Sequence, residues 1–377
     1  MTNNQISRIT GSVSLMVWLV ASTASCQREP ATQIVSEPRG TLTPARDLTV
    51  PRALHTVTRL VNGKLLVVGG GTPGAAINTA ELVDLATGNA RVLTLTVPRL
   101  GHTATLLSNG DVLIVGGGYG SDAATNRTAE LFDHATESFR ATGRPTEPRV
   151  DHAAVLLATG RVLIVGGDTS GVGRSPTAAA EEYDPSTGVF TKVSNMSIPR
   201  RPFGVVRLGN GQVLIAGGTT TNKQVVASAE VYTPTTMSFT AVGNLAVPRE
   251  KHTAATLTDG RILIAGGSKG PSDGDRLATT EFYNPQSMRF ESGPPMAIPR
   301  HKVASAVLPS GRVIVVGGGN GLAEVFDPAA NAFFPVSGAG GIERLYPAAT
   351  ALGDGSVLIT GGYTSGGSKS TTWIYRP

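Results

Sequence analysis

The chain has 377 residues, of which 40% are hydrophobic and 16% are charged, and it contains 47 glycines and 24 prolines. This composition excludes general disorder and predicts frequent turns with few helices. The net charge is +5, but no basic run accompanies it, so we expect no nucleic-acid partner, and the single cysteine excludes an intrachain disulfide or a multi-cysteine metal site.

The N-terminus has the pattern of an export signal. A polar start precedes an apolar segment, VSLMVWLVA, at residues 13–21, and small residues at 22–25 lead to Cys26. The apolar segment is too short to span a bilayer, and we assign residues 1–25 to a signal peptide. Small residues ending at a cysteine resemble the bacterial lipobox, which implies lipidation of Cys26, although Thr23 stands where that motif prefers leucine. The alternative is ordinary cleavage at the same place, which would leave a soluble exported protein.

The segment after the cysteine fits a tether. Residues 26–39 are polar and would form a flexible linker between the lipid anchor and a domain at residues 40–377. Gln27 follows the cysteine, and the lipoprotein resemblance implies that only aspartate there would retain the protein at the inner membrane. We therefore expect an outer-membrane lipoprotein, periplasmic or surface-exposed, that contacts the membrane through its anchor alone.

A repeat fills the remaining chain. Two apolar runs, such as 104–107 and 112–115, flank a tight-hairpin pair such as Asn109 and Gly110, and the second run ends in a diglycine. A third segment begins with glutamate in six units, and a turn and an aromatic residue then open a fourth strand. Each unit is therefore predicted to be a four-stranded meander. The repeated glutamates are Glu81, Glu130, Glu181, Glu230, Glu281 and Glu324.

Seven diglycines whose first members lie 44 to 51 residues apart resemble the punctuation of the kelch repeat, in which each unit is one propeller blade. The last unit stops at its third strand, residues 373–377, and the N-terminal segment 42–52 aligns with the fourth-strand segment 239–249. We therefore predict an all-β, seven-bladed kelch-type β-propeller with four-stranded blades, whose last blade is closed by an N-terminal strand.

The predicted architecture is similar to the central domain of galactose oxidase. A copper radical oxidase of that type needs a cysteine crosslinked to tyrosine, and Cys26 lies outside the propeller. We therefore expect neither that activity nor a cofactor, and we assign no catalytic residue.

Two repeated residue types raise the question of scaffold or site. An arginine follows a proline in six units and could form a cationic ring at a channel mouth, or could pair with the repeated glutamate and tie adjacent blades together. These arginines are Arg52, Arg99, Arg149, Arg200, Arg249 and Arg300. A histidine stands three residues later in four units, at His55, His102, His152 and His252. Four histidines could indicate zinc, but repetition at one position favours the same strand contact in each blade, and we expect no metal.

Differences between blades are where binding is expected. The loop after the diglycine is shortest in blade six, residues 319–322, which predicts a notch between the longer loops of blades five and seven. The candidate ligand-binding residues are Lys269, Asp273, Asp275 and Arg276 on one side, Tyr363 and Lys369 on the other, and His301 and Lys302 below. Blade four also departs from the repeat, at residues 201–203. The alternative is that these Gly/Ser-rich loops are tolerated insertions.

The function we predict is a non-enzymatic, monomeric binding scaffold that presents the notched face to a protein or glycan partner at the cell envelope, where short loops on a closed ring lose little entropy on binding. One alternative is a carbohydrate-active enzyme, of the sugar epimerase, mutarotase or lyase type, that uses the channel mouth. Another is a purely structural envelope protein.

Overall fold

The computed structural model describes residues 37–72, 75–118, 127–170, 175–270, 272–318, 321–338 and 343–377. The predicted signal peptide, Cys26 and residues 26–36 of the predicted linker lie outside these residues. Residues Ser36–Pro377 form one compact unit. Among the described residues, no helix is long and apolar enough to cross a membrane.

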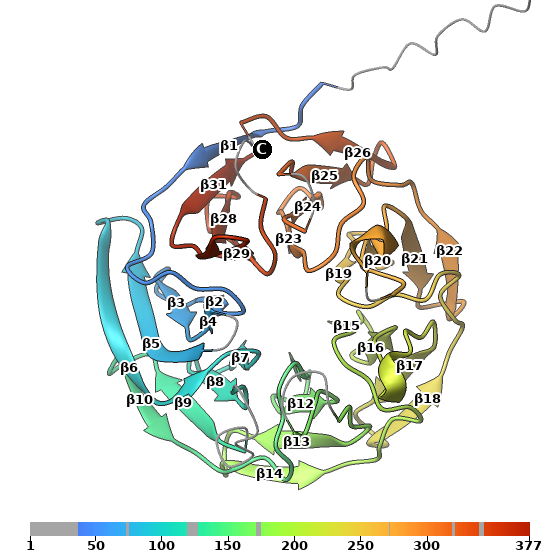
Figure 1. The fold of residues 1–377 in the computed structure, drawn as a ribbon. Coiled ribbons are helices and arrows are strands. Elements are labelled where there is room, and N and C mark those ends of the chain that lie inside the picture. The colour runs from blue at the N-terminus through green and yellow to red at the C-terminus, as the bar shows by residue number, and fades with distance from the viewer. Residues whose placement is uncertain are drawn as a thin grey trace, which may run out of the picture. The chain divides into compact units, whose positions relative to one another are not determined.

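Seven antiparallel sheets follow one another around a central axis, so the predicted seven-bladed all-β propeller is confirmed (Figure 1). Blades one to three contain β2 (Thr56–Arg59), β3 (Leu65–Val68), β5 (Ala75–Asp84) and β6 (Asn89–Arg99); β7 (Thr103–Leu106), β8 (Val112–Val115), β9 (Ala129–Asp133) and β10 (Ser138–Ala141); and β11 (Ala153–Leu156), β12 (Val162–Val165), β13 (Ala180–Asp184) and β14 (Val189–Lys192). Blades four to six contain β15 (Gly204–Arg207), β16 (Val213–Ala216), β17 (Ala229–Thr233) and β18 (Ser238–Ala241); β19 (Thr253–Thr256), β20 (Ile262–Ala265), β21 (Thr280–Asn284) and β22 (Arg289–Ser292); and β23 (Ala304–Val307), β24 (Val313–Val316), β25 (Glu324–Asp327) and β26 (Ala332–Pro335). Blade seven contains β27 (Ala348–Ala351), β28 (Val357–Thr360), β31 (Thr372–Arg376) and β1 (Thr41–Pro44).

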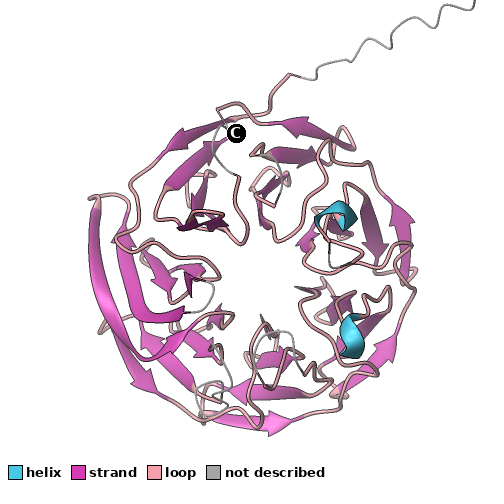
Figure 2. Cartoon of the chain, viewed as in Figure 1, coloured by secondary structure: helices cyan, strands magenta, loops and turns pink. Residues whose placement is uncertain are grey.

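Shorter elements decorate the loops between second and third strands. β4 (Gly71–Thr72) extends the sheet of blade one, and β29 (Tyr363–Thr364) pairs with β30 (Gly367–Ser368) in blade seven. Two single-turn 3₁₀ helices, η1 (Thr221–Lys223) and η2 (Asp273–Asp275), are the cyan turns in blades four and five of Figure 2. Because successive strands are antiparallel, these loops share one face with the connections that enter each blade, and the hairpin turns occupy the opposite face.

Blade seven closes the ring as predicted. β1 pairs antiparallel with β31, with Leu42 opposite Tyr375. The backbone N–H of Leu42 also donates to the Ser337 carbonyl of blade six at 2.9 Å, and the Leu42 side chain is 2% exposed. The first strand of the domain therefore joins its last strand, and no blade of the ring ends in an unpaired third strand.

The core lies between the blades. The second strand of each blade is buried over its whole length, because its alternate residues face the two neighbouring blades. In β3, Leu66 and Val68 pack with Val112 of blade two, while Leu65 packs with Leu358 of blade seven. This two-sided burial explains why the second strands read as unbroken apolar runs in the sequence.

Each of the six arginines that follow a proline forms a buried ion pair with the repeated glutamate, with a guanidinium nitrogen 2.7 to 2.9 Å from a carboxylate oxygen. In blade five, Arg249 Nη1 donates to the carbonyls of Gly266 and Thr279 at 2.8 and 2.9 Å, while its Nη2 contacts Glu281 Oε1 at 2.7 Å. Glu281 Oε2 accepts from the N–H of Ala246 at 2.7 Å. Because Ala246 belongs to the connection from blade four, the pair fastens that connection to blade five. The pairs expected from the scaffold interpretation are thus present.

The diglycines join each blade to the next. The second glycine donates its N–H to the carbonyl of the next blade's arginine, as from Gly267 to Arg300 at 2.8 Å, and the bond from Gly362 to Arg52 at 2.9 Å links blade seven to blade one. Gly266 has φ +67°, and a Cβ there would lie 2.6 Å from the Arg300 carbonyl oxygen. Only glycine fits such a close approach of two backbones.

Candidate functional site at the channel mouth

The predicted notch residues fall into two loops. In the blade-five loop, Asp275 Oδ2 accepts from Ser272 Oγ at 2.7 Å, and the Lys269 N–H donates to the Asp275 carbonyl at 3.0 Å, so Asp275 caps its own loop. Hydrogen bonds from Ser272 lower the pKa of Asp275. Arg276 forms a backbone bridge with Ser268 in the same loop. The side chain of Asp273 and residues 319–320 of the predicted notch lie outside the described residues.

Tyr363 and Lys369 belong to the blade-seven loop. Tyr363 lies in β29, and the Lys369 carbonyl accepts from the N–H of Arg52 at 3.0 Å. Among the described residues, no hydrogen bond or ion pair links Asp275 to Lys369. A ligand-binding role for the notch stays a prediction.

His301 and Lys302 lie at the channel mouth. His301 is 4% exposed, and its N–H donates to the Gly318 carbonyl at 3.1 Å. The ammonium group of Lys302 lies 5.5 Å from the ring centroid of Tyr346, and the Lys302 carbonyl accepts from the Tyr346 N–H at 2.9 Å. These contacts place Lys302 in a larger set of residues that the sequence analysis missed.

This set, which we call the mouth ring, consists of the second residue after the arginine in each blade. Its members are Leu54, Gly101, Asp151, Pro202, Lys251, Lys302 and Tyr346. Backbone hydrogen bonds join neighbouring members, as from Asp151 to Gly101 at 2.8 Å and from Lys302 to Lys251 at 2.9 Å. Among the described residues, no such bond joins Asp151 to Pro202, which has no N–H, or Pro202 to Lys251, or Tyr346 to Leu54.

Six of the seven members have φ between 53° and 63°. This left-handed conformation costs a residue with a Cβ roughly 1–2 kcal/mol, and glycine adopts it freely. Blade two uses glycine there, but five other blades carry leucine, aspartate, lysine, lysine and tyrosine. Non-glycine residues adopt the same conformation in four outer turns, at Glu137, Met237, Met288 and Asn331, and in the blade-four loop, at Asn222 and Lys223, but these positions do not recur in every blade. At the mouth, side chains of different chemistry meet where all blades converge.

Members of the mouth ring line a cavity of about 270 Å³. Leu54, Gly101, Asp151, Pro202 and Tyr346 contribute to its wall, together with Phe203 and three of the repeated histidines. The wall therefore combines apolar and aromatic side chains with polar groups in similar measure.

The histidines of the wall are neutral blade-to-blade contacts. The Nε2 atoms of His55, His102 and His152 lie 2.7 to 3.0 Å from threonine hydroxyls of the preceding blade. Burial, assisted by the neighbouring arginines, lowers the pKa of His55 and of His102 to about 3. Within the described part of the chain, no group of three or more His, Cys, Asp or Glu side chains is arranged to hold a metal ion.

The carboxylate of Asp151 occupies the space left by Gly101. A Cβ built on Gly101 would lie 2.6 Å from Asp151 Oδ1. Desolvation raises the pKa of Asp151 to about 6. The nearby charges have smaller effects, since the cations lower this pKa and the carboxylates raise it. The two cations among those charges already have partners. Arg201 forms a close charge pair with Asp168, with Nε 2.8 Å from Oδ2, and Lys251 pairs with Glu250.

Replacing Asp151 with asparagine is expected to stabilise the protein at pH 7. The folded-state pKa lies above the unfolded value, so ionisation costs stability above pH 6, by on the order of 2 kcal/mol at neutral pH. Asparagine removes the charge and tolerates the left-handed conformation. Denaturant unfolding at pH 7 should show the gain, and it should shrink at pH 4.5, where the native aspartate is protonated in the folded protein. A loss of stability at pH 7 would contradict this account.

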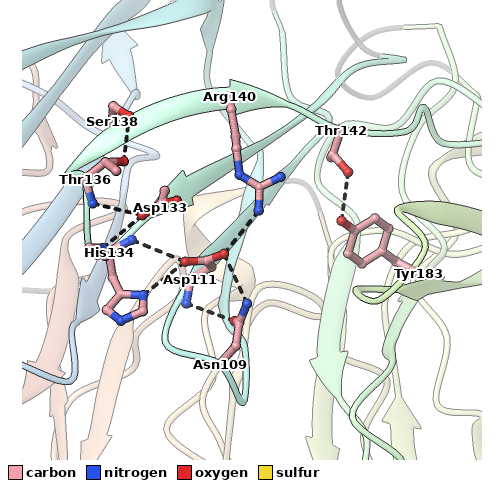
Figure 3. A network of polar contacts seen from close by, with 10 residues as sticks. Asn109, Asp111, Asp133, His134, Thr136, Ser138, Arg140, Thr142 and Tyr183 are labelled. Atoms are coloured by element: carbon pink, nitrogen blue, oxygen red, sulfur yellow. Dashed lines mark hydrogen bonds and ion pairs between the residues drawn. The ribbon is translucent and has the colours of Figure 1, made fainter.

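A second polar cluster lies on the opposite face, in blade two (Figure 3). Asp111 is 6% exposed, and its carboxylate lies 3.0 Å from His134 Nδ1, 3.1 Å from Asn109 Nδ2 and 3.3 Å from Arg140 Nη2. In blade three the equivalent position carries a cation, Arg161, so blade two has a negative charge where blade three has a positive one. Because these partners surround the carboxylate, we interpret the cluster as structural.

Comparisons with known proteins agree with the architecture. The sequence matches the family model described as the KLHDC2/KLHL20/DRC7 Kelch-repeats domain over residues 54–267. A search of curated proteins finds no match. A fungal alcohol oxidase of the AA5 family, solved in complex with copper, is 18% identical, with a TM-score of 0.75 over 90% of this chain and 76% of that one. At this identity the likeness shows the fold alone, and the copper and the oxidase activity are properties of that protein.

Proposed function

The chain belongs to the kelch-repeat family, and from this premise we propose that it is a non-enzymatic binding scaffold that recognises a protein or glycan partner at the cell envelope. The recognition surface is the face that carries the mouth ring and the loops between second and third strands. Proposed export by the N-terminal signal, with a lipid anchor on Cys26, would place this face in the envelope.

One observation carries the proposal. The residues that stabilise the blades are the same from one blade to the next. The mouth-ring residue, in contrast, differs in nearly every blade and adopts a conformation that glycine would adopt at the least cost. Strained backbone that persists with large side chains is typical of functional sites. The side chains of Asp151, Lys251, Lys302 and Tyr346 are therefore the ones we expect a partner to contact.

The test is capture from a solubilised envelope fraction and from a glycan array, using the full chain and three variants. Lys302→Gln changes the mouth ring, and a second variant shortens the blade-five loop at residues 268–277. Arg261→Gln, on the opposite face, is the matched control. We expect a partner that binds the native chain and the control but is lost with Lys302→Gln. Loss only with the shortened loop would move recognition to the notch, and an identical catch from all four proteins would overturn the proposal.

A carbohydrate-active enzyme at the same mouth remains the second candidate because of one observation. The pKa of Asp151, raised to about 6, suits a general acid or base near neutral pH. An enzyme of this kind should interconvert sugar anomers or epimers in an NMR assay and should lose turnover with Asp151→Asn while still binding the sugar. Absence of turnover across monosaccharides, with binding retained, would remove this candidate.

A further inference from the structure

We propose that the cavity at the mouth ring binds an organic cation, an ammonium or guanidinium group, with the carboxylate of Asp151 as its counter-ion. This inference rests on the proposed function, because it names the chemistry that the mouth ring recognises. The cation would be either a lysine or arginine side chain of a partner protein or a small free amine.

The first argument is the carboxylate itself. Asp151 lines the cavity, and no described residue gives its carboxylate a hydrogen bond or an ion pair. The cations nearest in effect, Arg201 and Lys251, are held by Asp168 and Glu250. Asp151 is half-buried, so its carboxylate is accessible from the cavity, and a cation there would form a charge-assisted contact with it.

A second acceptor lies at the same place. Around the mouth ring, the backbone carbonyl of one member accepts from the N–H of the next, as at Gly101 and Lys302. The member after Asp151 is Pro202, which has no N–H, and among the described residues no hydrogen bond ends on the carbonyls of Asp151, Pro202 or Tyr346. Of these three open acceptors, the Asp151 carbonyl is the one whose residue also carries a carboxylate. Ammonium and guanidinium groups carry several donors and suit such a pair.

The walls favour a cation over an anion. Asp151 is the only charged side chain at pH 7 among the described residues that line the cavity, because the histidines there are neutral. Phe203 supplies an aromatic ring, whose π face attracts cations, and the Tyr346 ring already has the ammonium group of Lys302 5.5 Å from its centroid. An anionic ligand would meet the carboxylate of Asp151 and no cationic side chain among the residues that line the cavity.

The volume limits the size of the group. A cavity of about 270 Å³ lies just below the range of roughly 300–1,000 Å³ that holds drug-sized ligands. The inner space therefore accommodates one long side chain or one small amine.

The test uses four probes with the same four-carbon chain: n-butylammonium, n-butylguanidinium, n-butanol and butyrate. Binding to the full-length protein is followed by saturation-transfer NMR and isothermal titration calorimetry at pH 7.5. We expect the two cations to bind and the alcohol and the carboxylate not to bind. Equal binding of all four probes, or binding of butyrate alone, would overturn the proposal.

Variants assign the binding to Asp151. Asp151→Asn keeps the shape and the backbone preference and should weaken butylammonium binding by about tenfold or more, since a charge-assisted contact is lost. Asp259→Asn, on the opposite face, is the control and should bind as the native protein does. Unchanged affinity in Asp151→Asn would overturn the inference. Circular dichroism and thermal unfolding of both variants exclude a folding defect as the cause.

The same probes separate this inference from the proposed function. If butylammonium displaces a captured partner, the partner inserts a cationic side chain, and if it binds without displacing the partner, a small amine is the ligand. A partner that is lost with Lys302→Gln but retained by Asp151→Asn, with no cation binding, would keep the scaffold function and refute the cation site.

Discussion

Replacing Glu281 with glutamine should lower the free energy of unfolding by about 3–5 kcal/mol, because it leaves the buried guanidinium of Arg249 without its counter-charge. Both side chains are nearly inaccessible, with exposed fractions of 0% for Arg249 and 4% for Glu281. Burial lowers the pKa of Arg249 and the charge of Glu281 opposes that shift, so removing Glu281 exposes the full desolvation penalty. Chemical denaturation of the two proteins at pH 7 measures the loss.

The matched control is an ion pair at the surface. Arg91 Nη2 lies 2.7 Å from Glu137 Oε2, but the Arg91 side chain is 54% exposed. Arg91→Gln should therefore cost less than about 1 kcal/mol. Equal losses for the two variants would contradict the role assigned to the buried pairs.

Acidification from pH 7 to pH 5 should remove roughly 2 kcal/mol of stability for each buried histidine of the repeat. Burial and nearby arginine charges lower the folded-state pKa of His55, His102 and His252 to about 3. Between pH 6.5 and pH 3 the unfolded chain binds protons that the folded protein does not, so stability falls as the pH falls through this window. Asp151 acts in the opposite direction and offsets part of the loss between pH 6 and pH 4.

Guanidinium unfolding at pH 7 and pH 5 measures this dependence. Blade four carries Phe203 where four other blades carry histidine, so His102→Phe copies an arrangement that the fold already contains. The loss of unfolding free energy between pH 7 and pH 5 should be smaller in this variant by roughly 2 kcal/mol, which is the contribution of one histidine. A stability that is flat between pH 7 and pH 5 in the native protein would refute the prediction.

Repetition explains how much of the fold the sequence predicts. A contact that six of the seven blades share, such as that of Arg52 with Glu81, is written six times and can be found by comparing the chain with itself. Blade seven escaped this comparison because Glu343 replaces the proline before Arg344. Its arginine lies over the ring of Trp373, 4.3 Å from the centroid, at the strand position where other blades have glutamate.

The candidate site was harder to predict for the opposite reason. Members of the mouth ring vary from blade to blade, so self-comparison gives them no signal, and Asp151 looks like an arbitrary residue beside a repeated histidine. Their left-handed backbone and their meeting at one axis depend on ring closure, which brings Leu54 and Tyr346 near each other from opposite ends of the domain. The sequence singles out His301 and Lys302 because blade six departs from the repeat, and the structure places Lys302 in the mouth ring.

The closed ring also determines how the protein should respond to a protease. Every blade is held on two sides, by apolar packing and by a bond from a glycine N–H to an arginine carbonyl, and β1 with β31 joins the two ends of the domain in one sheet. A single cut in a loop that joins two consecutive blades, such as blades three and four, therefore leaves two fragments that share two blade interfaces, and neither can leave without breaking both. Nicked protein should remain one particle in solution and should separate into fragments only in denaturant.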